Sequence, residues 1–168
     1  SNNTVSIIEE LSTGEILIGT TEGLSIYNRE TASFKSYLTN GNEELKEGHN
    51  VLSILETKNK KIYIGTNSGL YELIILDDNT EFKIINNTKK LFIQDLVETP
   101  SATLLLASKT KSVLEYNPKT ERLTNYFLED ELEEGTNSVR QLLFDNDNQL
   151  WVGTYNGIKI VNANKEVL

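Results

Sequence analysis

The chain has 168 residues, of which 38% are hydrophobic and 24% are charged, a composition that indicates a folded globular body and excludes a disordered chain. Its formal net charge of -9 at pH 7 disfavours nucleic acid and anionic lipid as partners, because both are bound mainly by Lys and Arg. There is no Cys, and no apolar run approaches the roughly 20 residues that span a bilayer, so we expect no disulfide, no thiolate chemistry and no direct membrane insertion of this segment.

Four copies of one pattern follow one another along the sequence. The best preserved pieces are ILIGTTEGLSIYN (residues 16–28), IYIGTNSGLYEL (62–73) and LWVGTYNGIKIVN (150–162), and LLLASKTKSVLEYN (104–117) is a degenerate copy. Two columns, one of Gly or Ala and one aliphatic, recur at the same spacing of about 45 residues, which identifies a repeat protein. The columns contain Gly19, Gly65, Ala107 and Gly153, and Val5, Val51, Ile93 and Val139.

Each repeat predicts four short strands. The second is apolar on both sides, as is typical of a strand in a sheet that is covered on both faces. A tight hairpin closed by Gly23, Gly69 or Gly157 leads to the third strand, because Gly accepts a positive φ at little cost. In chain order the strands are expected from Val5, at 16–19, from Leu24 and at 34–38; from Val51, at 62–65, from Leu70 and at 82–85; from Ile93, at 104–107, from Val113 and at 123–127; and from Val139, at 150–153, from Ile158 and as a stub at 166–168.

Four antiparallel strands per repeat form the blade of a β-propeller. We therefore predict an all-β fold of β-propeller blades, four modules of four antiparallel strands each, as a partial or half propeller. Residues 1–168 are expected to form a single propeller fragment. Its blades are predicted at approximately residues 3–48, 49–90, 91–136 and 137–168.

The motif of a Val-x-x-Ile run, a loop, L-W-V-G-T-x-x-G-[LI] and a Tyr-Asn turn resembles the two-component regulator propeller repeat. The third copy departs from it, because Ala107-Ser108 replaces Gly-Thr and Lys111 stands where the closing Gly is expected. The resemblance implies an extracytoplasmic sensor region, periplasmic or at the cell surface, of a bacterial membrane receptor such as a hybrid histidine kinase. Such sensors detect glycan fragments, so a glycan or another small ligand is the implied partner.

The residues offer little catalytic chemistry. His49 is the sole histidine, and with no Cys a nitrogen or sulfur metal site is not expected. The stretch Asp145-Asn146-Asp147-Asn148 has oxygen ligands at alternate positions, but it lacks the Gly and the distal Glu of a calcium loop, so we interpret it as a turn. We predict no catalytic residue, no metal and no cofactor.

A ligand site is expected where the loops that enter the first strands and the hairpins between second and third strands open on one face of a propeller. The candidate residues on this rim are His49, Asn50, Thr66, Asn67, Ser68, Asn137, Thr154, Tyr155 and Asn156. The Thr of the repeated Gly-Thr is interpreted first as a residue that shapes the hairpin. Trp151 is interpreted as a residue that packs between blades, with stacking on a sugar as the alternative.

These observations predict a non-catalytic sensor or interaction module of a signal-transduction receptor. Two alternatives stay open, a propeller enzyme of the lyase or hydrolase type and a pure dimerisation scaffold. The apolar sides of the first and fourth blades need a partner, which predicts a homodimer through the terminal blades.

Overall fold

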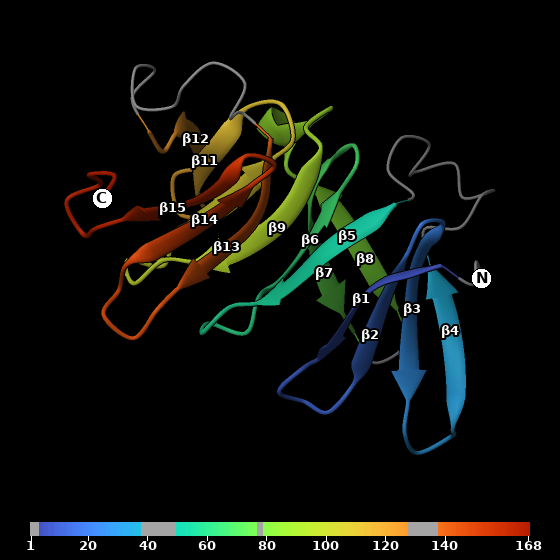
Figure 1. The fold of residues 1–168 in the computed structure, drawn as a ribbon. Coiled ribbons are helices and arrows are strands. Elements are labelled where there is room, and N and C mark those ends of the chain that lie inside the picture. Colours follow the sequence, from blue (N-terminus) through green and yellow to red (C-terminus); the bar gives the residue numbers. More distant parts are fainter. Residues whose placement is uncertain (1–3, 38–49, 77–78, 128–137) are drawn as a thin grey trace. The chain divides into compact units, whose positions relative to one another are not determined.

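The computed structural model describes residues 4–37, 50–76, 79–127 and 138–168, and within these ranges it contains four antiparallel sheets (Figure 1). The chain divides into two compact units, Ser1–Lys90 and Leu91–Leu168. The first unit holds the first two sheets, and the second unit holds the other two. Among the described residues no helix has the length and apolar character needed to cross a membrane.

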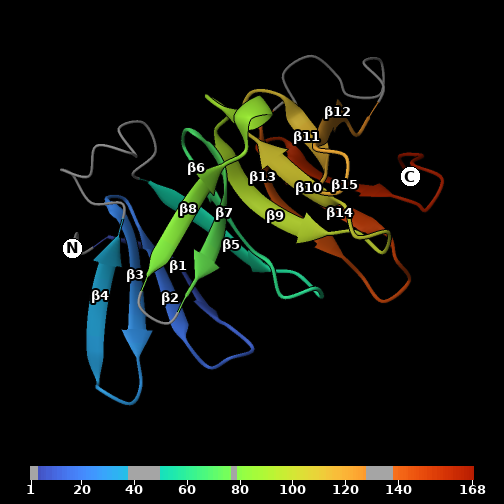
Figure 2. The same cartoon turned by 180° about the vertical axis from the view of Figure 1, so that it is seen from behind.

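In the first unit each sheet is a meander whose strands pair in chain order. The first sheet consists of β1 (Val5–Glu10), β2 (Ile16–Thr20), β3 (Gly23–Asn28) and β4 (Ser33–Tyr37). The second consists of β5 (Val51–Glu56), β6 (Ile62–Thr66), β7 (Gly69–Ile75) and β8 (Thr80–Ile84), followed by the 3-10 helix η2 (Asn86–Thr88). Figure 2 shows the two sheets from behind, with β4 and β8 as their outer strands.

The second unit repeats this arrangement. The third sheet consists of β9 (Ile93–Glu98), β10 (Leu104–Ser108), β11 (Ser112–Asn117) and β12 (Arg122–Asn125). The fourth sheet consists of β13 (Val139–Phe144), β14 (Leu150–Thr154) and β15 (Gly157–Val161). The stub predicted at residues 166–168 is reduced to an isolated bridge between Val161 and Val167.

The predicted fold class, all-β with four antiparallel propeller blades, is confirmed. The repeats also share fine detail, because the register shifts after the first residue of β1, β5 and β13, between Val5 and Ile7 in the first copy. The prediction of one propeller body with the blade limits given above stays a prediction.

The hairpin of the third copy differs from the sequence-based expectation. Ser108 pairs with Ser112, so the loop contains three residues and Ser112 takes the position that Gly157 takes in the fourth copy. Ser112 accordingly has a φ of 61°, and Gly157 has a φ of 123°. The closing position is therefore Ser112 and not Lys111, and this hairpin loop is one residue longer than the loop between Thr154 and Gly157.

Within each unit one sheet packs on the next through opposite faces, which we call trailing and leading. In the first unit the trailing face of the first sheet, with Leu17 and Leu24, packs on the leading face of the second sheet, with Val51 and Ile54. The contact is close, because a Cβ built on Gly19 would lie 2.6 Å from Val51 Cγ1. The Gly column of the repeat therefore lets the first strand of the next sheet approach.

The second unit has the same interface. The trailing face of the third sheet, with Leu105 and Val113, packs on the leading face of the fourth, with Val139 and Leu142. Asp95 of β9 adds a polar contact, because its Oδ2 accepts a hydrogen bond from Leu142 N at 2.7 Å. One packing rule thus joins the sheets of both units.

Candidate functional site

The structure brings together four of the predicted rim residues in the first unit. Asn67 N donates a hydrogen bond to Asn50 O at 3.2 Å, and Asn50 N donates one to Asn67 Oδ1 at 3.4 Å. Thr66 Oγ1 donates to Gly69 O at 2.9 Å and accepts from Ser68 N at 3.1 Å. The Thr66 side chain is buried and used inside the turn, whereas Asn67 is exposed and Ser68 is half-buried.

In the second unit the predicted residues Thr154, Tyr155 and Asn156 form the β14–β15 hairpin. Thr154 repeats the contacts of Thr66, because its Oγ1 donates to Gly157 O at 3.1 Å and accepts from Asn156 N at 3.1 Å. The hydroxyl of the repeated Gly-Thr therefore closes the hairpin, in agreement with the interpretation from the sequence. His49 and Asn137, the other two predicted residues, lie outside the described residues.

Tyr155 has a partner that the sequence reasoning missed. Its side chain is 63% exposed, and the Arg140 guanidinium lies over its ring, with Cζ 4.7 Å from the ring centroid. Arg140 Nη1 also donates a hydrogen bond to the Tyr155 hydroxyl at 2.9 Å. This pair presents an aromatic surface held in place by a cation, which is a suitable surface for stacking against a flat or ring-shaped ligand.

Two loop side chains in equivalent positions carry buried polar atoms that have no hydrogen-bond partner among the described residues. They are Asn50 Oδ1 and Ser138 Oγ, each just before the first strand of its sheet. Buried polar atoms are paired in the great majority of cases, so unpaired ones identify positions that can take a further hydrogen bond. Both residues directly follow segments outside the described residues, and a binding role of these loops stays a prediction.

Both carboxylate oxygens of Asp145 already accept hydrogen bonds from their own turn and from Trp151. Asp145 Oδ1 accepts hydrogen bonds from Asp147 N at 3.0 Å and Gln149 N at 2.8 Å, and its Oδ2 accepts one from Trp151 Nε1 at 2.8 Å. These bonds, with that from the indole foremost, lower the pKa of the Asp145 carboxyl. Among the described residues no three His, Cys, Asp or Glu side chains are grouped as a metal site requires.

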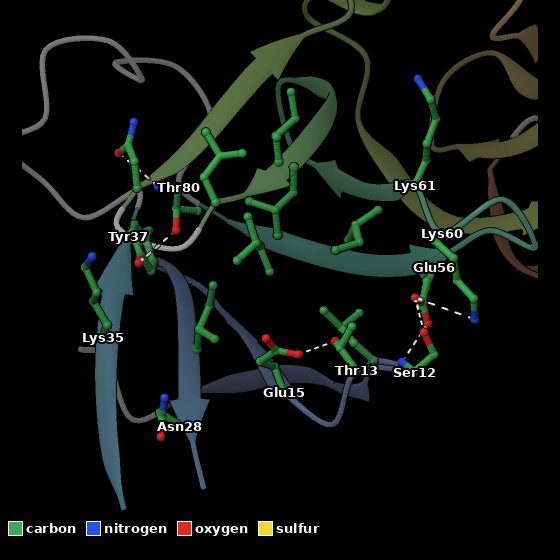
Figure 3. Close-up of a pocket in the computed structure, with 18 of the residues that line it drawn as sticks. Ser12, Thr13, Glu15, Asn28, Lys35, Tyr37, Glu56, Lys60, Lys61 and Thr80 are labelled. Atoms are coloured by element: carbon green, nitrogen blue, oxygen red, sulfur yellow. Dashed lines mark hydrogen bonds and ion pairs between the residues drawn. The ribbon is translucent and has the colours of Figure 1, made fainter. Parts of the chain in front are cut away.

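A cleft that was not predicted from the sequence lies between the two sheets of the first unit (Figure 3). It is a cleft of about 1040 Å³, bounded on one side by β3 and β4 and on the other by β7 and β8. Its apolar lining includes Ile26, Leu73 and Ile75. At one end Thr80 Oγ1 donates a hydrogen bond to the Tyr37 hydroxyl at 2.9 Å.

Two ion pairs line this cleft, Lys60 with Glu56 and Lys61 with Glu72. Ser12 donates two hydrogen bonds to Glu56, from N to Oε2 at 2.8 Å and from Oγ to Oε1 at 2.6 Å, and Lys60 lies 4.0 Å from the same carboxylate (Figure 3). Lys61 Nζ lies 2.6 Å from Glu72 Oε1. The hydroxyl of Ser12 is the largest cause that lowers the pKa of Glu56. A carboxylate of lowered pKa is a weaker base than an ordinary one.

Antiparallel blades, their face-to-face packing and their polar hairpins define a chain of β-propeller blades. Residues 133–156 match the family model described as two component regulator propeller, which confirms the resemblance seen in the repeats. A comparison with curated proteins finds no matching sequence.

Solved structures share the fold. The extracellular domain of BT4673, a proposed one component system of B. thetaiotaomicron, matches with a TM-score of 0.79 and 22% identity over 99% of this chain and 22% of that chain. The extracellular domain of BT3049, a proposed hybrid two component system of the same organism, gives 0.74 and 19% identity over 99% of this chain and 22% of that chain. Virginiamycin B lyase from Staphylococcus aureus gives 0.69 and 15% identity over 98% of this chain and 54% of that chain. The chain thus spans about a fifth of the two extracellular domains.

Proposed function

We propose that this chain is part of an extracytoplasmic sensor of a bacterial signal-transduction receptor, and that it binds a ligand or partner without catalysing a reaction. The observation that carries the proposal is the match of residues 133–156 to the two component regulator propeller family. The extracellular domains from B. thetaiotaomicron support it as architectures built from the same blades. Because their sequence identity to this chain is low, they are evidence for the fold alone.

The ligand is proposed to contact the exposed hairpin residues. In the second unit Tyr155 offers an exposed ring and Asn156 an exposed amide, both on the β14–β15 hairpin. Such a set suits a neutral oligosaccharide, whose rings stack on aromatic faces and whose hydroxyls pair with amides and hydroxyls. A strongly anionic glycan is disfavoured by the net charge of -9.

Calorimetric titration with short neutral oligosaccharides from xylan, mannan and arabinan tests this proposal. We expect at least one to bind, and Tyr155→Ala to weaken it by about tenfold, or ~1.4 kcal/mol. Tyr155→Phe is the matched control, because it keeps the ring and removes only the hydroxyl, and it should bind nearly as the wild type does. The glycan proposal fails if no member of the panel binds, or if Tyr155→Ala binds as tightly as the wild type.

An enzymatic role is the second candidate, because virginiamycin B lyase has the same fold. The known activity of that protein does not transfer at 15% identity. Turnover of the same oligosaccharides or of a cyclic ester substrate, abolished by His49→Ala, would favour the enzyme. We expect no turnover and no effect of His49→Ala on folding. A chain that neither binds nor reacts, and only associates with itself, would correspond to a pure scaffold.

A further inference from the structure

Two sheet faces of the chain are apolar and exposed where the repeat pattern elsewhere buries them. The first is the leading face of the first sheet. Ile8 is 63% exposed there, whereas Ile54, the same column in the second sheet, is 6% exposed because it packs on the first sheet. Val5 is likewise exposed, and its counterpart Val51 is buried. On the outer part of this face Tyr27 and Phe34 stack, with ring centroids 4.8 Å apart.

The second is the trailing face of the fourth sheet. Ile158 is 68% exposed, whereas its counterparts Leu24 in the first sheet and Val113 in the third are each 1% exposed. Leu143 and Trp151, which pair across β13 and β14 on the same face, are exposed as well. The hydrogen bond from the Trp151 indole to Asp145 holds the ring in place, so the face is preorganised.

The glycines Gly19 and Gly153, which occupy the same position in their repeats, indicate which side chain would pack on this face. In the first sheet a Cβ on Gly19 would lie 2.6 Å from Val51 Cγ1, the residue that opens the next sheet. In the fourth sheet a Cβ on Gly153 would have no atom closer than 3.6 Å, and that atom belongs to Gln141 of its own sheet. The sheet surface at Gly153 therefore has room for a β-branched side chain such as the one that Val51 places against Gly19. No described residue fills that space.

We propose that the trailing face of the fourth sheet binds the leading face of the first sheet of a second copy of this chain. The chain itself contains this interface twice, between its first and second sheets and between its third and fourth. Val5 and Ile8 of a second copy have the same chemistry and spacing as Val51 and Ile54 in the first interface, and as Val139 and Leu142 in the second. Apolar faces of this kind are rarely left in water by a monomer.

The proposed contact is heterologous, because it joins two different faces. Contacts of this kind either close into a ring of chains or continue as an open array. This distinguishes it from a symmetric contact in which one face meets its own copy. The association does not depend on the sensor function, and a chain that binds no ligand could still form it.

Sedimentation equilibrium over a wide range of concentrations tests the proposal. The wild type should rise above the mass of one chain, 19.0 kDa, as the concentration increases. Ile8→Glu and Ile158→Glu should each stay at 19.0 kDa alone, because each lacks one of the two faces. Mixed together they should form a one-to-one complex, because the intact face of one meets the intact face of the other. Leu76→Glu, an exposed apolar residue on neither face, should associate as the wild type does.

Gly153→Ala is a subtler probe. At concentrations where both are single chains it should fold and melt as the wild type does, because a Cβ fits at this position and no left-handed backbone is involved. It should nevertheless weaken association by at least about tenfold, because Val5 of the partner copy could not approach. The proposal is overturned if the wild type stays at 19.0 kDa at every concentration, if either Glu variant associates alone, or if Gly153→Ala associates normally.

Discussion

The carboxylate of Asp95 in β9 accepts a hydrogen bond from the backbone N of Leu142 in β13 at 2.7 Å, and so connects the third sheet to the fourth. Its other oxygen accepts one from Leu96 N at 2.9 Å. Asp95→Ala should destabilise the second unit by about 1–3 kcal/mol, because Leu142 N would be left buried without a partner. Urea unfolding compared with Asp147→Ala, an exposed turn residue, measures the effect. Equal stability of the two variants would show that the bond contributes nothing.

Asp95 also predicts a dependence of stability on pH. Burial is the main cause that raises its pKa, and the two hydrogen bonds counteract it. A carboxyl whose pKa is higher in the folded than in the unfolded state contributes stability at low pH, and this is lost as the pH rises through the folded pKa. The wild type should therefore lose stability relative to Asp95→Asn as the pH rises from about 4 towards neutrality. A constant difference across this range would contradict the assignment.

For the Ser12–Glu56 contact we expect the opposite dependence of stability on pH. The pKa of Glu56 is lowered, so its contribution is present above the unfolded pKa and is lost as the pH falls through the folded pKa. Ser12→Ala should cost about 0.5–1 kcal/mol at neutral pH, because the pair is near the surface. The deficit should shrink in acid. Thermal melts at neutral and acidic pH check it, with Thr31→Ala as an exposed control, and a deficit that grows in acid would reverse our interpretation.

The hairpin glycine of the fourth blade predicts a backbone effect. Gly157 has a φ of 123°, and no atom lies within 4 Å of a Cβ built there, so Gly157→Val should be harmful through backbone strain and not through a clash. We expect a loss of about 1–3 kcal/mol. Lys111→Val, in the longer hairpin of the third blade, should change little. Equal thermal stability of the two variants would mean that the hairpin positions are wrongly assigned.

Two glycines of one column should respond differently to the same substitution. Gly19→Ala would place a methyl group 2.6 Å from Val51 Cγ1, and the rearrangement should cost about 1–3 kcal/mol. Gly153→Ala has room and should be nearly neutral in the isolated chain. Denaturant unfolding of both variants at low concentration makes the comparison. A Gly19→Ala variant as stable as Gly153→Ala would contradict the close packing of the first two sheets.

The sequence predicted the blades because the pattern of each strand depends on local chemistry. Apolar runs, the Gly-Thr column and the closing glycines recur in every well preserved copy, and the strands β2, β6 and β14 lie where the repeats predict them. In the third copy the pattern did not establish the register, because Lys111 and Ser112 are both poor substitutes for Gly. Pairing of Ser108 with Ser112 decides between them.

The sites were less predictable because they depend on how elements meet. The register shift between Val139 and Gln141 leaves Arg140 outside the regular pairing, where it reaches Tyr155. No spacing in the sequence reveals this contact. The cleft between the first two sheets likewise arises from the space between their outer strands, with Tyr37 on one side and Thr80 on the other.

The most direct test of the account is a titration of the isotopically labelled chain with the neutral oligosaccharides, followed by backbone amide NMR. A binding oligosaccharide should shift the amide signals of Tyr155 and Asn156 in the β14–β15 hairpin and should be recovered unchanged. Shifts confined to the cleft at Tyr37 and Thr80 would contradict the proposed site. Conversion of the oligosaccharide to products would contradict the central claim, that this propeller module binds its ligand without catalysing a reaction.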